Sequence, residues 1–174
     1  LELAKNRIPW LLILMFTSIL SGAILMDYRE AIQVLPLLLS FVPMLMDTSG
    51  NCGNQSSTMV IRGMAVGDIE LKDVLRVVWK EFRVGLLCGA VLAAANFIRL
   101  ILQYPDRQAL NLVIVLSLML AIVLAKIIGC VLPMLAEKMK LDPAIMAAPL
   151  ITTIVDASSL LIYFKIASMM LQLS

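Results

Sequence analysis

The chain has 174 residues, of which 61% are hydrophobic and only 15% are charged, and its mean hydropathy is +0.99. That composition excludes an ordinary soluble domain, whose surface needs far more charge. The net charge of +2 is too small to suggest nucleic-acid binding, and the absence of histidine counts against imidazole-based zinc or copper sites. The sequence is therefore that of an integral membrane protein.

Five apolar segments predict five transmembrane helices, because about 20 apolar residues suffice to cross a bilayer. Between the second and third segments, Leu71, Val74, Leu75 and Val78 lie at helical spacing with charges between them. This pattern predicts an amphipathic helix at the membrane interface that runs into the third span. The expected fold class is an all-α membrane protein, with one transmembrane domain over 1–174. The predicted spans are 8–26, 31–58, 82–103, 110–136 and 143–172.

The distribution of lysine and arginine predicts the orientation, since these residues concentrate on the cytoplasmic side. With the N-terminus in the cytoplasm, nine basic residues lie inside and four lie outside, while Lys126 falls within a helix. We therefore expect a multi-pass protein of the plasma (inner) membrane with an extracytoplasmic C-terminus. The inner residues are Lys5, Arg7, Arg62, Lys72, Arg76, Lys80, Arg83, Lys138 and Lys140, and the outer ones are Arg29, Arg99, Arg107 and Lys165.

The second segment is apolar in its first half and polar in its second, DTSGNCGNQSST at 47–58. Pro36 and Pro43 favour a kink, and we expect the segment to be broken. Polar groups at membrane depth are tolerated only inside protein or along a water-filled cavity. The candidates for such a path are Asp47, Gly50, Asn51, Gly53 and Asn54. The alternatives are that the small and polar residues only join helices, and that Asp47 caps a helix piece.

The fifth segment contains a single charge between Asp142 and Lys165, which is Asp156. A charge at the bilayer centre costs about 2.5–3.5 kcal/mol on insertion scales, so it normally faces a partner, a cavity or an ion. One interpretation is that Asp156 forms a structural salt bridge with Lys126 or Lys165. The other is a cation-binding site, because Ala148, Thr152 and Asp156 share a helix face that is bordered by Ser159. The hard oxygen ligands of this face suit magnesium or calcium.

The two segments PMLMDTSGNCGNQSSTMVIRGMA at 43–65 and LDPAIMAAPLITTIVDASSLLIYF at 141–164 resemble the MgtE family of magnesium channels and transporters. The five-span layout agrees with this resemblance over nearly the whole chain. The resemblance implies a homodimer in the lipid bilayer with a central pore lined by the second and fifth spans. It also implies that Asp156 holds a hydrated magnesium ion with the backbone near Thr152, and that Asp142 lies near the inner mouth.

The chain departs from the family in two respects. Family members usually carry a cytoplasmic regulatory region ahead of the first span, and we expect it to be absent here. Some members also have an asparagine where this chain has Ala148, so we expect manganese and calcium to compete with magnesium. Two other functions stay open: an intramembrane aspartyl protease using Asp47 and Asp156, and a membrane scaffold that transports nothing. Because neither aspartate has the Gly-x-Gly-Asp pattern of such proteases, we expect no enzyme.

Overall fold

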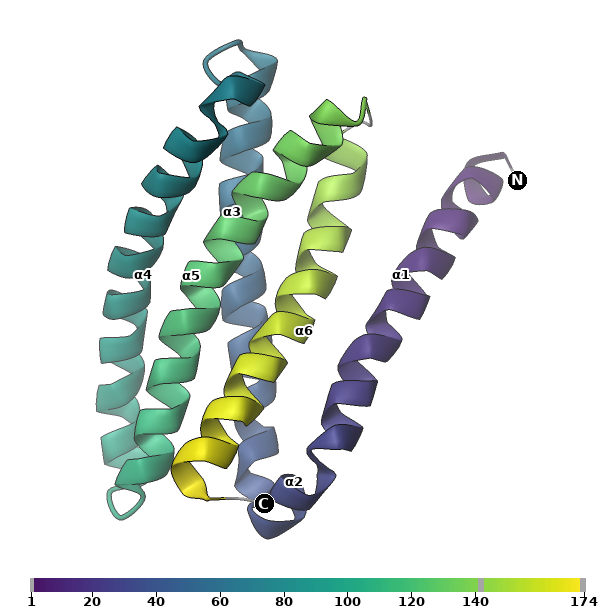
Figure 1. Cartoon of the computed structure of the whole chain (residues 1–174). Helices are drawn as coiled ribbons and strands as arrows, with labels where there is room; N and C mark the ends of the chain where they lie inside the picture. Colours follow the sequence, from purple (N-terminus) through teal and green to yellow (C-terminus); the bar gives the residue numbers. More distant parts are fainter. Residues whose placement is uncertain (1, 141–142, 173–174) are drawn as a thin grey trace.

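The computed structural model describes residues 2–140 and 143–172, and every regular element in that part of the chain is helical (Figure 1). Four long helices and α1 run roughly along one direction, so the chain passes back and forth between two ends. The elements are α1 (Glu2–Asp27), α2 (Arg29–Val34), the 3-10 helix η1 (Pro36–Phe41), α3 (Val42–Ala65), the 3-10 helix η2 (Leu71–Asp73), α4 (Val74–Gln103), α5 (Gln108–Lys138) and α6 (Pro143–Leu171).

Three of the described helices are long and apolar enough to cross a membrane by length and composition. They are Leu71–Gln103, Gln108–Lys138 and Leu150–Leu171, which correspond to the third, fourth and fifth predicted spans. The first predicted span lies within α1, and the second, 31–58, overlaps α2, η1 and the first part of α3, so the count of five spans is not confirmed among the described residues. The all-helical membrane fold is thus confirmed, with three candidate spans.

The predicted break in the second segment is present, and it lies before the polar half. Helix α2 ends at Val34, and the chain then forms η1, whose Leu38 carbonyl accepts a hydrogen bond from the Tyr163 hydroxyl at 3.0 Å. Pro43 lies in the first turn of α3, where backbone N–H groups have no carbonyl partner within the helix, so the missing N–H of proline costs no hydrogen bond. The polar residues that follow form a regular helix, because α5 and α6 pack against it.

The amphipathic stretch does not form a separate helix. Residues 67–70 make a turn, in which Gly67 adopts a φ of +81°, and η2 follows. Glu70 and Asp73 then cap each other's backbone N–H groups, so a regular helix begins at Val74 and continues to Gln103. The interfacial helix is therefore not confirmed among residues 67–83, whose second half forms the first turns of α4.

Helix α5 packs against α3, α4 and α6 (Figure 1). Its backbone approaches that of α3 closely at one point, since a Cβ added to Gly129 would overlap the carbonyl oxygen of Gly53. Such contact between backbones needs glycine on both helices. This packing fixes the position of α3 next to α6, on which the candidate site depends.

The basic residues sort to the two ends as predicted. The N-terminus, the α3–α4 connection and the α5–α6 connection lie at one end of the bundle, and the C-terminus and the α4–α5 connection lie at the other (Figure 1). We call the first of these the basic end, because it carries the predicted inner residues, including Arg62, Arg76 and Lys138.

Candidate functional site

A groove of about 400 Å³ lies between α3 and α6. Six of the residues that line it are candidates from the sequence, and the other three are apolar residues at the start of α3. The six are Asp47, Gly50, Asn51, Asn54, Thr152 and Asp156, and the three are Val42, Pro43 and Met46. The structure therefore brings the polar half of the second segment and the carboxylate of the fifth segment to one place.

Helical spacing explains why these residues meet. Asp47, Gly50, Asn51 and Asn54 are separated by three, one and three positions, so they share one face of α3. On α6, Thr152 and Asp156 are four residues apart and share a face as well. The Asn54 amide nitrogen donates to the Thr152 hydroxyl at 3.4 Å, which joins the two faces.

Two oxygen atoms of the groove are buried and accept no hydrogen bond from the described residues. They are Oδ1 of Asn54 and Oδ1 of Asp156. A buried polar atom without a partner costs about 1–3 kcal/mol, so such atoms need an explanation in a native fold. Carboxylate and amide oxygens are ligands of magnesium and calcium, either directly or through water. The groove thus offers unused acceptors of the kind that a hard cation requires.

The salt bridge of Asp156 with Lys126 or Lys165 is not present among the described residues. Lys126 instead pairs with Glu81, with 3.8 Å between Nζ and Oε2, and Lys165 is exposed. Among the residues that the structure describes, no salt bridge involves Asp156. Its carboxylate is therefore available to a ligand in the groove.

Asp47 does not cap a helix piece. It lies in the second turn of a continuous α3, whose N-cap residue is Phe41, so the capping interpretation is wrong. Its side chain is exposed, as is that of Asn51. Asp47 therefore places a second carboxylate on the open side of the groove.

Gly50 leaves room beside Asp156. A Cβ added at Gly50 would lie 3.8 Å from Oδ1 of Asp156 and 3.8 Å from Cγ2 of Thr152, which is ordinary contact. A methyl group would therefore fit there, but a larger side chain would fill the groove.

Two predicted residues, Gly53 and Ser159, do not line this groove. Gly53 packs on α5, and Ser159 shares a 2.8 Å hydrogen bond with Ser49 inside the α3–α6 contact. Asp142 lies outside the described residues, and only the helical backbone of Ala148 is described. No group of three acidic, thiol or imidazole side chains gathers in the described part of the chain. The described residues of one chain therefore do not form a complete acidic shell for a metal ion.

Sequence reasoning missed the role of Glu81, which falls in the stretch predicted to form an amphipathic helix running into the third span. Its carboxylate pairs with Lys126 and accepts a hydrogen bond from Ser56. The face predicted to be apolar is also shifted, since Val77 is buried and Leu75 is 83% exposed. Two features of the sequence could have indicated this pair. Val77, Glu81 and Gly85 are four residues apart and so share a helix face, and Lys126 is a basic residue within an apolar segment.

The exposed face of α3 carries polar residues along most of its length. Asp47, Asn51, Gln55 and Thr58 recur every three or four positions and are all exposed. We call these four residues the polar stripe. From Asp47 to Thr58 the stripe extends roughly 17 Å at 1.5 Å per residue, about half of a hydrocarbon core about 30 Å thick.

These features define a multi-pass helical membrane protein with an acidic, oxygen-lined groove along two neighbouring helices, a construction suited to cations. A family model described as "MgtE: Divalent cation transporter" matches residues 42–166, which is most of the chain. The chain belongs to the MgtE family. That family is one of transporters, so the expectation that the protein is not an enzyme is confirmed.

Three curated relatives are each named magnesium transporter MgtE. The protein of Thermus thermophilus is 38% identical over 167 residues, which cover 95% of this chain and 36% of that protein. The protein of Bacillus subtilis is 37% identical over 165 residues, with the same two coverages. The protein of Enterococcus faecalis is 33% identical over 172 residues, which cover 99% of this chain and 38% of that protein. The chain spans little more than a third of the length of these relatives.

Proposed function

We propose that this chain forms the membrane pore of a magnesium transporter, as a homodimer whose pore is lined by α3 and α6. The observation that carries the proposal is the polar stripe beside the groove that holds Asp156. In a chain that is 61% hydrophobic, this stripe is exposed along α3, beside the candidate span of α6. Polar groups cannot face lipid tails cheaply, so the stripe requires water or protein beside it.

A two-fold dimer would supply what the described residues of one chain lack. A symmetric pair presents the same surface from both subunits, so two stripes would face each other across the axis. The pore would then contain two copies each of Asp47 and Asp156, in place of the single pair of one groove. A water-filled path between the stripes would also hydrate the exposed amides and hydroxyls of α3. The match to a family of divalent cation transporters favours transport over a scaffold that transports nothing.

The transported ion is proposed to stay hydrated at Asp156. Magnesium requires near-octahedral coordination at about 2.0–2.1 Å and gives up its water reluctantly. The groove offers few oxygens within one chain, so water molecules of the ion would bridge to Asp156 and to the backbone near Thr152. Recognition then acts on the size of the hydrated complex, and manganese and calcium would compete with magnesium. Asp142, at the start of α6, is proposed to lie near the inner mouth.

The proposed orientation places the basic end of the bundle in the cytoplasm, with the protein in the plasma (inner) membrane. The basis is the bias of lysine and arginine toward that end. A membrane potential that is negative inside would then drive cations inward, with about 2.3 kcal/mol per elementary charge per 100 mV.

The test is magnesium flux into liposomes that carry a magnesium-sensitive dye and a potassium-valinomycin potential. Asp156→Asn keeps the shape of the side chain but removes the charge that concentrates the cation, so saturable uptake should fall at least about tenfold. The matched control is Asp106→Asn, since Asp106 is an exposed carboxylate in the α4–α5 connection. Unchanged uptake by a folded, dimeric Asp156→Asn protein would exclude the pore role of this residue.

A further inference from the structure

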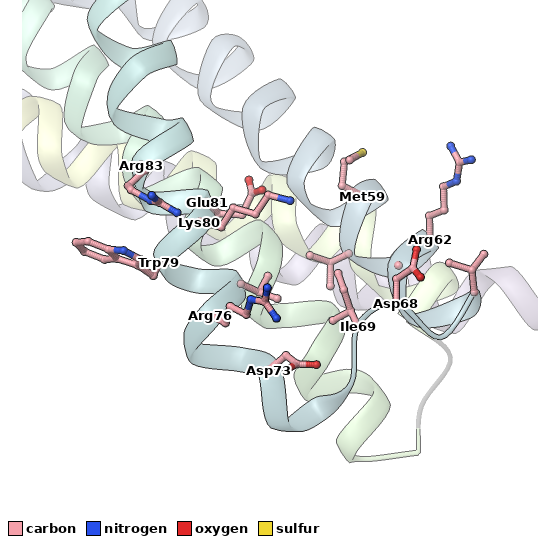
Figure 2. A pocket seen from close by; sticks show the side chains of 14 residues that line it. Met59, Arg62, Asp68, Ile69, Asp73, Arg76, Trp79, Lys80, Glu81 and Arg83 are labelled. Atoms are coloured by element: carbon pink, nitrogen blue, oxygen red, sulfur yellow. The ribbon is translucent and has the colours of Figure 1, made fainter.

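A second pocket lies at the basic end of the bundle, away from the groove. It has a volume of about 710 Å³ and is enclosed by the last turns of α3, η2 and the first turns of α4 (Figure 2). Four basic side chains line it: Arg62 from α3, and Arg76, Lys80 and Arg83 from α4. On α4 these residues are four and three positions apart, so they share one side of the helix.

The acidic residues of the pocket, Asp68, Asp73 and Glu81, compensate only part of this positive charge. Glu81 is engaged with Lys126 and Ser56, and Asp73 accepts a hydrogen bond from the Glu70 backbone N–H at 3.0 Å. Asp68 is the third acid of the lining. Within residues 2–140 and 143–172, the four basic side chains have no carboxylate within 4.0 Å, because the salt bridges there join Lys72 to Glu70 and Lys126 to Glu81. The pocket is therefore suited to an anion.

The pocket also has exposed apolar walls. Trp79 is 59% exposed and Met59 is 64% exposed, although both line the pocket. The Arg83 guanidinium lies over the Trp79 ring, 6.0 Å from its centroid, and Figure 2 shows the two side chains next to each other. Tryptophan and basic residues together are typical of the level at which a spanning helix meets lipid headgroups, and α4 continues from here as a candidate span. A small soluble phosphate would make no use of these apolar walls.

We propose that this pocket binds the phosphate headgroup of an anionic phospholipid, with Arg76 and Lys80 at the phosphate, Arg62 on the opposite rim of the pocket, and Trp79 against the glycerol and upper acyl region. The combination of unpaired basic side chains and exposed apolar walls at the start of a spanning helix favours a lipid over a free phosphate. This inference is independent of the ion path, because no residue of the pocket lines the α3–α6 groove.

The test uses the fluorescence of Trp79. The chain contains two tryptophans, so Trp10→Phe leaves Trp79 as the single reporter. Purified protein in detergent micelles is titrated with brominated phosphatidylglycerol or with brominated phosphatidylcholine, and quenching gives an association constant for each. A basic residue near an anionic surface is worth about fivefold in binding, so phosphatidylglycerol should be preferred about tenfold or more.

The double variant Arg76→Gln/Lys80→Gln, in the Trp10→Phe background, should reduce this preference to within about twofold. The matched control is Lys72→Gln, because Lys72 is exposed, pairs with Glu70 and does not line the pocket. If the double variant fails to fold, Arg62→Gln alone should lower the preference by about fivefold. Arg62 is exposed in the last turn of α3, so its replacement leaves the packing intact.

Several results would overturn the proposal. One is equal quenching by the two lipids, and another is a phosphatidylglycerol preference that survives the double variant. Binding of inorganic pyrophosphate at micromolar concentration, lost in the double variant and without a lipid preference, would assign the pocket to a soluble phosphate. The same pattern with a polyglutamate peptide would assign it to an acidic protein segment. Liposome uptake of magnesium is measured separately, so failure here leaves the proposed function untouched.

Discussion

Two carboxylates within the helical bundle, Glu81 and Asp156, have opposite surroundings. Glu81 pairs with Lys126 and accepts a hydrogen bond from Ser56, so its charge is compensated. Asp156 lines an open groove, and one of its oxygens has no hydrogen-bond partner among the described residues. A carboxylate with partners inside the protein thus contributes to packing, whereas a carboxylate without such partners is available to bind a ligand. We therefore expect stability to depend on Glu81 and transport to depend on Asp156.

The largest expected effect is on stability at Glu81. Glu81→Ala leaves the Lys126 charge buried without its partner, so the free energy of unfolding should fall by about 3–5 kcal/mol. Thermal unfolding in detergent measures the change. The double variant Glu81→Leu/Lys126→Met removes both charges and should recover most of the loss, because apolar residues often replace a buried pair at little cost. A double variant as unstable as Glu81→Ala would contradict a role based on charge pairing.

The next largest effect is on stability and distinguishes Gly129, on α5 against α3, from Gly50 on α3 itself. A Cβ at Gly129 would overlap the Gly53 backbone, so Gly129→Ala should lower the free energy of unfolding by about 1–3 kcal/mol as overpacked sites do. Gly50→Ala, whose new methyl would make ordinary contact at 3.8 Å, is the matched control and should be nearly neutral. The same thermal unfolding assay applies. Equal losses for the two variants would mean that the α3–α5 contact is looser than described.

Water along the polar stripe can be tested by thiol reactivity in liposomes. Gln55→Cys on α3 and Val91→Cys on α4 are both exposed positions, one in the polar stripe and one on an apolar surface. In a Cys88→Ser background, Gln55→Cys should react with a charged thiol reagent at least about tenfold faster, since the thiolate forms only where water is present. Similar rates at the two positions would argue against a water-filled path beside α3.

The smallest expected effect is at Asp47. Asp47→Asn keeps the shape and removes one charge from the exposed side of the groove, so uptake should fall by roughly twofold to fivefold, or about 0.4–1 kcal/mol. Thermal stability should not change, because Asp47 lies inside α3 and caps nothing. Reduced stability with normal uptake would assign the residue to structure.

The sequence predicts the groove better than it predicts the packing around it. Asp47, Asn51 and Asp156 stand out because they are polar residues in apolar segments, and helical periodicity places them on common faces. The kink near Pro36 follows from the chemistry of proline in the same way.

The partner of Lys126, in contrast, depends on which face of α4 turns toward α5. The capping pair of Glu70 and Asp73 sets the start of that helix, and periodicity alone assigns Leu75 to the wrong side. The approach of Gly53 to Gly129 is likewise a contact between distant segments. Such registers arise from tertiary packing, to which local patterns contribute little.

In the proposed pore, Asp156 holds a hydrated cation on the axis of a dimer. The structure of the protein soaked with manganese, located by its anomalous signal, and then with magnesium tests this placement directly. We expect one ion between the Asp156 side chains of the two chains, with water between them, so that the metal lies beyond about 4 Å from the carboxylate oxygens. A dehydrated ion bound at about 2.1 Å by six protein oxygens, or an ion held away from Asp156, would contradict it.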